Sequence, residues 1–117
     1  MSKTSTALLV KLVMTFIAAV IAFTVLDRNA WGWVAVVALA GTILNYLIGD
    51  LFILPKAGNV VASLGDGVLG ALTAYLLDLM VPAFNTTWLS LVLFGVLVAV
   101  AEYFFHMYLR RSDKVAP

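Results

Sequence analysis

Long apolar stretches separated by short polar breaks dominate the chain. The first covers residues 7–26, is interrupted only by Lys11, and is followed by the polar residues 27–29. Three further stretches cover about residues 33–54, 60–81 and 88–109. A bilayer core about 30 Å thick is crossed by about 20 apolar residues of helix. The pattern therefore predicts an all-α integral membrane protein with four antiparallel transmembrane helices in a compact bundle, forming a single domain over residues 1–117.

The composition agrees with a lipid environment. Hydrophobic residues make up 64% of the chain and charged residues 11%, whereas a soluble domain carries about 25% charged residues. The lipid bilayer is therefore an expected partner. The seven Lys and Arg residues form no basic face or long basic run, which argues against nucleic-acid binding. Cysteine is absent from the sequence, which excludes disulfides and thiolate metal sites.

The basic residues are distributed unevenly between the two ends of the predicted bundle. One end carries Lys3, Lys11, Lys56, Arg110, Arg111 and Lys114. The other end carries Arg28 alone. Cytoplasmic loops of membrane proteins contain an excess of Lys and Arg. The distribution predicts a multi-pass protein with both its N- and C-termini in the cytoplasm.

The stretch GDLFILPKAGN, residues Gly49 to Asn59, joins the second and third apolar segments. Ending the second helix at Gly49 would leave the apolar side chains of residues 51–54 in the cytosol. Extending it to Leu54 gives a normal span of about 22 residues. Pro55 is then expected to end this helix, because the residue before a proline is disfavoured in helical geometry. Asn59 is expected to cap the third helix, and Thr86 or Thr87 the fourth.

The longer stretch GDLFILPKAGNVVASLGD, Gly49 to Asp66, resembles the signature of the YndM-like family of small four-helix membrane proteins from Gram-positive bacteria. The local motif is GDxxILPxxGN followed by an Asp in the next helix. The resemblance implies a location in the bacterial cell (inner) membrane and the same four-helix architecture. It implies no reaction or ligand, because the family is one of unknown function.

Small residues recur at helical spacing on the third and fourth predicted helices, where they favour close helix packing. The helix-packing candidates are Ser63, Gly67, Gly70, Ala74, Gly95 and Ala99. The edge of the third helix that contains Gly67 and Gly70 is suited to contact with a second copy of the chain. The sequence therefore predicts a homo-oligomer, most simply a dimer.

Several polar and ionisable residues fall within the predicted spans. The candidate pocket for an ion or proton comprises Lys11, Asn45, Asp50, Asp66, Glu102 and His106. At 1.5 Å per helical residue, the charged members and the histidine lie roughly 6–12 Å inside the cytoplasmic boundary. Charged groups in hydrocarbon cost at least about 2.5–3.5 kcal/mol each, so these side chains are expected to face inward and pair.

Two interpretations of this pocket remain open at the level of sequence. In the first, the charges pair only to fix the arrangement of the bundle. In the second, a water-filled vestibule open to the cytoplasm binds a proton or a small cation, and the protein is a proton- or cation-linked transporter or channel. A further alternative is a non-transporting accessory or scaffold subunit that binds a larger membrane partner.

An enzymatic function has little support in the sequence. The chain lacks H-E-x-x-H, G-x-S-x-G and phosphate-binding glycine loops. Glu102 and His106 form an E-x-x-x-H pair, which leaves a metal-dependent membrane enzyme as an alternative. We therefore predict no catalytic residues, no cofactor and no dedicated metal site.

Overall fold

Four helical segments long and apolar enough to cross a membrane follow one another along the chain. In the computed structural model, which describes residues 3–112, they cover Ser5–Leu26, Trp31–Ala57, Asn59–Met80 and Trp88–Tyr108. No strand occurs within these described residues. The predicted all-helical architecture with four membrane-compatible helices is confirmed. Lys114 of the predicted basic end lies outside the described residues.

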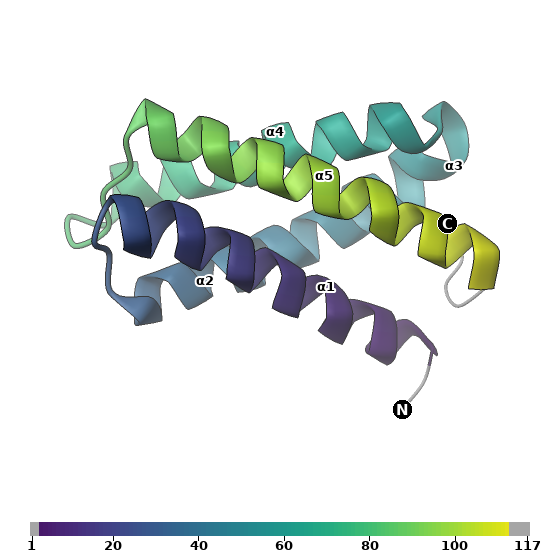
Figure 1. Cartoon of the computed structure of the whole chain (residues 1–117), viewed down its shortest axis with the longest axis horizontal. Coiled ribbons are helices and arrows are strands. Elements are labelled where there is room, and N and C mark those ends of the chain that lie inside the picture. The colour runs from purple at the N-terminus through teal and green to yellow at the C-terminus, as the bar shows by residue number, and fades with distance from the viewer. Residues whose placement is uncertain (1–2, 113–117) are drawn as a thin grey trace.

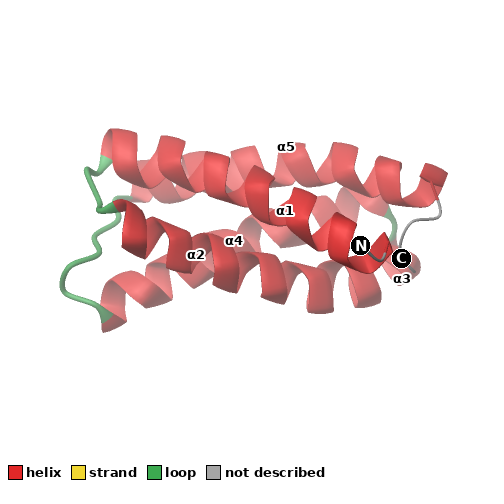
Figure 2. Cartoon of the chain, turned by 90° about the horizontal axis from the view of Figure 1, so that it is seen from below, coloured by secondary structure: helices red, strands yellow, loops and turns green. Residues whose placement is uncertain are grey.

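Each of the first two spans changes its helical geometry along its length. Helix α1 (Lys3–Ala19) continues as the π-helix η1 (Val20–Leu26). Helix α2 (Trp31–Leu44) continues through the π-helix η2 (Asn45–Ile53) into the short helix α3 (Leu54–Ala57). Helices α4 (Asn59–Met80) and α5 (Trp88–Ser112) form the last two spans. The N-terminal end of α1, the C-terminal end of α5 and helix α3 share one end of the bundle (Figure 1), and loops join the helices at the other end (Figure 2).

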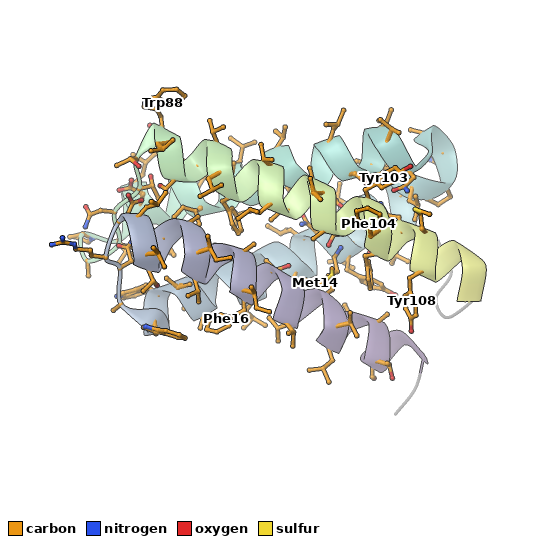
Figure 3. All side chains as sticks on the ribbon, viewed as in Figure 1. Met14, Phe16, Trp88, Tyr103, Phe104 and Tyr108 are labelled. Carbon is orange, nitrogen blue, oxygen red and sulfur yellow. The ribbon has the colours of Figure 1, made fainter. Side chains whose placement is uncertain are left out.

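The outer surface of the bundle is apolar, while most of the charge inside the spans is buried. Ile17 is 54% exposed, Val68 61% and Val96 54%, yet Lys11 is fully buried. Trp88 projects outward at the start of α5 (Figure 3), where an indole suits the membrane interface. This distribution reverses that of a water-soluble bundle, and it fits a helical bundle surrounded by lipid.

Aromatic rings fill the interior at the end of the bundle that contains residues 27–30. The ring of Phe23 lies 5.6 Å from that of Phe84 and 4.9 Å from that of Phe94, measured between centroids. All three rings are fully buried. Ala19 and Ala22 on the neighbouring turns leave room for them. This apolar core closes one half of the bundle interior, so buried charges are confined to the other half.

Helices α4 and α5 approach each other closely through glycine. A Cβ atom on Gly67 would overlap the carbonyl oxygen of Gly95, and one on Gly70 would lie 3.1 Å from the Phe94 ring. Ser63, Gly67, Gly70 and Ala74 are buried within the chain. The edge that suggested a dimer interface in the sequence therefore packs against α5 of the same chain. It is not free to contact a second copy.

The connector between α3 and α4 differs from the prediction in two respects. Helical structure continues through Pro55 to Ala57, because Pro55 lies in the first turn of α3, where its missing N–H is not needed. The helix ends instead at Gly58, whose φ of 88° is readily adopted by glycine. Asn59 is not an N-cap: Gly58 occupies that position, and no side-chain cap hydrogen bond is formed. The Asn59 amide contacts α5 instead.

Polar side chains join the connecting segments at the opposite end. Thr87 caps α5 as predicted, since its Oγ1 accepts a hydrogen bond from Ser90 N at 3.2 Å while Thr87 N donates to Ser90 Oγ at 3.0 Å. Asp27 accepts hydrogen bonds from Thr87 and Ser90. Asn29 donates to the carbonyl oxygens of Phe23 and Asn85. These bonds fix the start of α5 against the end of η1.

Candidate functional site

Five ionisable side chains from four helical spans meet inside the bundle, and we call them the charged cluster. Its members are Lys11 of α1, Asp50 of η2, Asp66 of α4, and Glu102 and His106 of α5. Each is at most 1% exposed. By their positions along these helices, the members lie in the half of the bundle that contains α3, the N-terminal end of α1 and the C-terminal end of α5, beyond the aromatic core.

Lys11 is the permanent cation of the charged cluster. Its Nζ donates a hydrogen bond to Glu102 Oε2 and lies 3.2 Å from Asp50 Oδ2. The ammonium also lies 5.1 Å from the centre of the Phe105 ring, within range of a cation–π interaction. Lys11 therefore joins the first span to the second and the fourth.

His106 connects the carboxylates to Asn59, the first residue of α4. Its Nε2 lies 2.9 Å from Asp50 Oδ1, 3.1 Å from Asp66 Oδ2 and 3.4 Å from Glu102 Oε2. Its Nδ1 lies 2.8 Å from Asn59 Oδ1. The Asn59 amide nitrogen donates to the carbonyl oxygen of Tyr103 at 2.9 Å, which leaves Asn59 Oδ1 to act as an acceptor. His106 Nδ1 is therefore the donor in this bond, and Nε2 faces the carboxylates.

Asp66 is held against the backbone of the second span. A Cβ atom on Gly49 would overlap the Asp66 carboxylate, so the position of this carboxylate depends on glycine at this point of η2. Among the described residues, neither carboxylate oxygen of Asp66 has a hydrogen-bond partner. Buried polar atoms are normally paired with protein or solvent. Asp66 is thus an acceptor with unused capacity inside the charged cluster.

Asn45, the sixth residue of the predicted pocket, is buried in η2. It forms no hydrogen bond with the charged cluster. Within the described part of the chain, both polar atoms of its side chain lack a hydrogen-bond partner. Asn45 and Asp50 are five residues apart in η2, which corresponds to about one turn of a π-helix. Short π-helical segments occur frequently at functional sites. The change of geometry in η2 therefore coincides with the candidate site.

The charges within the cluster do not balance. Three carboxylates contribute −3 and Lys11 contributes +1 when all are ionised, which leaves −2 with a neutral His106 and −1 with an imidazolium. In a water-poor interior such an excess is costly. One or two additional positive charges would neutralise the cluster.

Three features of the site differ from the sequence-based prediction or were absent from it. The cluster is closed, since each of its members is at most 1% exposed, and this differs from the water-filled vestibule of the second interpretation. The hydrogen bonds of Asn59 with Tyr103 and His106, and the contact of the Lys11 ammonium with the Phe105 ring, were not predicted. Ser63, expected to serve only packing, also lies 3.2 Å from His106 Nδ1 and donates to Asn59 Oδ1 at 3.0 Å. The four-residue spacing between Asn59 and Ser63 was the available signal, since it puts both on one helix face.

Comparison with known proteins identifies the family. A family described as "Protein of unknown function (DUF2512)" matches residues 2–115. The chain belongs to the DUF2512 family. The predicted membership of a small four-helix family of unknown function is thereby confirmed, and the DUF2512 match includes all residues of the charged cluster. Comparison with curated proteins and with solved structures gave no match.

Proposed function

We propose that the charged cluster binds a proton or small cation and that this protein couples such binding to transport across the bacterial cell membrane. The observation that supports the proposal is the excess of carboxylates over permanent cations in a closed interior. Asp50, Asp66 and Glu102 face a single ammonium, that of Lys11. A structural ion pair would need only one carboxylate for that lysine.

The cost of this arrangement argues for a role beyond packing. Neutral residues of similar volume are often as stabilising as a buried ion pair, or more so. Ionisable groups within membrane spans are rare, and they frequently mark ion or proton pathways. Here four such groups accompany one lysine, and two of the carboxyl groups have oxygens without hydrogen-bond partners among residues 3–112. These groups have capacity to accept an additional cation.

The proposed orientation places both termini and α3 in the cytoplasm. Because the native chain has no cysteine, single Ala57→Cys and Ala83→Cys variants provide a matched test at the two ends of the bundle; both alanines are exposed. In intact cells, a membrane-impermeant thiol reagent is expected to label Ala83→Cys and to leave Ala57→Cys unlabelled until the cells are opened. The reverse pattern would show that the termini face outward.

Transport is tested with the purified protein in liposomes. Wild-type protein is expected to give proton or cation flux above that of empty liposomes. Asp66→Asn is expected to abolish the flux because it replaces an ionisable carboxylate, whose oxygens have no hydrogen-bond partner among the described residues, by a neutral amide. Asp78→Asn is the matched control, since Asp78 accepts hydrogen bonds from Thr86 at the opposite end. Flux is followed with a pH-sensitive dye and with cation-selective dyes inside the vesicles.

The alternative role, an accessory or scaffold subunit, gives a different result in the same assay. Folded wild-type protein would then produce no flux above empty liposomes for any ion tested. Flux that Asp66→Asn and Asp78→Asn reduce equally would also contradict the assignment of transport to the charged cluster.

A further inference from the structure

We propose that Asp50, Asp66, Glu102 and His106 form a binding site for one divalent transition-metal ion, with Lys11 beside it as a fixed balancing charge. This inference rests on the proposed function and specifies the class of cation that the charged cluster takes. It differs from the sequence-based expectation, which assigned no dedicated metal site.

The four side chains already present their donor atoms to a common centre. One carboxylate oxygen from each acid and one ring nitrogen of His106 all lie within 4.8 Å of one another. Bonds from a transition metal to oxygen or nitrogen of about 2.0–2.2 Å place opposite ligands about 4.0–4.4 Å apart. Small side-chain movements would therefore allow the four atoms to share one ion. Glu102 and His106 reach it from successive turns of α5, while Asp50 and Asp66 reach it from η2 and α4.

The orientation of His106 is that of a metal-binding histidine. Its Nδ1 donates to Asn59 Oδ1 at 2.8 Å, and its Nε2 faces three carboxylates. A ligating histidine usually donates its other ring N–H to a neighbouring acceptor, which fixes the tautomer and the direction of the ring. Asn59 supplies that acceptor, and its own amide is held by the Tyr103 carbonyl.

Asp66 gives a second and independent indication of a ligand. Its side chain is buried, and within the described residues neither of its oxygens has a hydrogen-bond partner. Asp66 Oδ2 lies only 3.1 Å from His106 Nε2. When the ring is neutral with its proton on Nδ1, Nε2 presents a lone pair both to Asp66 Oδ2 and to Asp50 Oδ1, which lies 2.9 Å away. Either a second ring proton or a bound metal ion would bridge these atoms, and a metal ion would use the lone pairs of both His106 and Asp66.

The charge of the cluster selects a divalent ion. Three carboxylates and the Lys11 ammonium sum to −2 when His106 is neutral. One divalent ion brings the buried group to zero, whereas one monovalent ion leaves −1. Because uncompensated charge is strongly disfavoured in a water-poor interior, the neutral assembly is the favoured one. Lys11 remains on the Glu102 and Asp50 side and need not leave.

The donor types narrow the choice of metal. Imidazole favours zinc, iron and nickel, carboxylates favour manganese and magnesium, and the chain has no thiolate. One nitrogen with three carboxylates suits Mn²⁺, Fe²⁺ or Zn²⁺. Calcium takes about six to eight oxygen ligands and magnesium retains several waters, so a closed site with one imidazole disfavours both.

The test uses full-length protein in detergent, with any purification tag removed and with bound metal stripped by a chelator. His106 is the only histidine of the chain, so nitrogen coupling to bound Mn²⁺ in pulsed electron paramagnetic resonance reports that residue. Wild type is expected to bind one Mn²⁺ or Zn²⁺ per chain by calorimetry, to unfold at a higher temperature with the metal, and to show the nitrogen coupling. Mg²⁺ and Ca²⁺ are expected to produce smaller shifts.

Variants separate a specific site from general charge attraction. Asp66→Asn and His106→Gln are expected to lower the affinity for Mn²⁺ by at least about tenfold, as loss of a metal-site residue does, and His106→Gln is expected to remove the nitrogen coupling. Asp78→Asn is expected to bind as wild type does. Each variant is first shown to be folded by its helical circular dichroism and its thermal transition.

Absence of saturable Mn²⁺ and Zn²⁺ binding by folded wild type would overturn the inference. Binding of equal affinity in wild type and in folded Asp66→Asn and His106→Gln would also overturn it. Proton or monovalent-cation flux through protein that binds neither metal would leave the proposed function standing and remove only the metal site. The two hypotheses can thus fail separately.

Discussion

Replacing Lys11 by methionine is expected to lower the free energy of unfolding by about 3–5 kcal/mol, the cost of leaving a buried charge without its partner. Lys11 is fully buried, donates to Glu102 and lies 3.2 Å from Asp50 Oδ2. Methionine has a similar length and preserves packing, so the loss comes mainly from repulsion among the carboxylates. Thermal and denaturant unfolding of the purified protein in detergent, with a chelator present, measures the effect.

A second substitution identifies the cause. Lys11→Met combined with Glu102→Gln removes one positive and one negative charge, and it is expected to be markedly more stable than Lys11→Met alone. Lys56→Met is the matched control: Lys56 is exposed and lies over the ring of Phe52, so only a small change is expected. A Lys11→Met protein as stable as wild type would show that the lysine does not compensate these carboxylates.

Replacing Gly67 by leucine is expected to destabilise the bundle by about 3 kcal/mol, the upper end of the usual range for overpacking. Even a Cβ atom at this point would overlap the carbonyl oxygen of Gly95, and backbone moves less easily than a side chain. Separation of α4 from α5 would also displace Asp66 from Glu102 and His106. Thermal unfolding followed by circular dichroism gives the measurement.

Gly32→Leu provides the control for the change of residue type. A Cβ atom on Gly32, in the first turn of α2, would meet no atom within 4 Å. Leucine there gains helix propensity of up to about 1 kcal/mol and creates no overlap, so the protein should be as stable as wild type or slightly more so. Equal unfolding temperatures for the two leucine variants would contradict the close contact of α4 and α5.

The four spans and the membership of the charged cluster followed from strong energetic constraints. About twenty consecutive apolar residues have few alternatives to a membrane helix, and intramembrane charges must point inward. Lys11, Asp50, Asp66, Glu102 and His106 were therefore placed together correctly. Asn45, which was predicted to belong to the pocket, is buried, but its polar side chain forms no hydrogen bond within residues 3–112.

The details that the sequence did not reveal depend on contacts between distant segments. Asparagine is a common N-cap residue, but the side-chain amide of Asn59 instead donates to the Tyr103 carbonyl oxygen and accepts from the His106 ring. Pro55 follows a π-helix and begins a new turn, where the usual rule that proline ends a helix does not apply. The small-residue face of α4 is equally suited to another copy or to another helix of the same chain, and only the tertiary arrangement selects α5.

The pairing of Lys11 with Glu102 has a consequence for how the chain is made. The two residues are 91 positions apart, in the first and the last span. During synthesis from the N-terminus, the first helix enters the bilayer with an ammonium whose carboxylate partner on the last helix has not yet been translated. Lys11 lies near the start of this span, so its unpaired ammonium is expected to extend toward the lipid headgroups until Glu102 is available. We therefore expect the first span to reach its final depth and rotation only after the fourth has inserted, so that the completed chain, rather than each successive helix, settles in the bilayer.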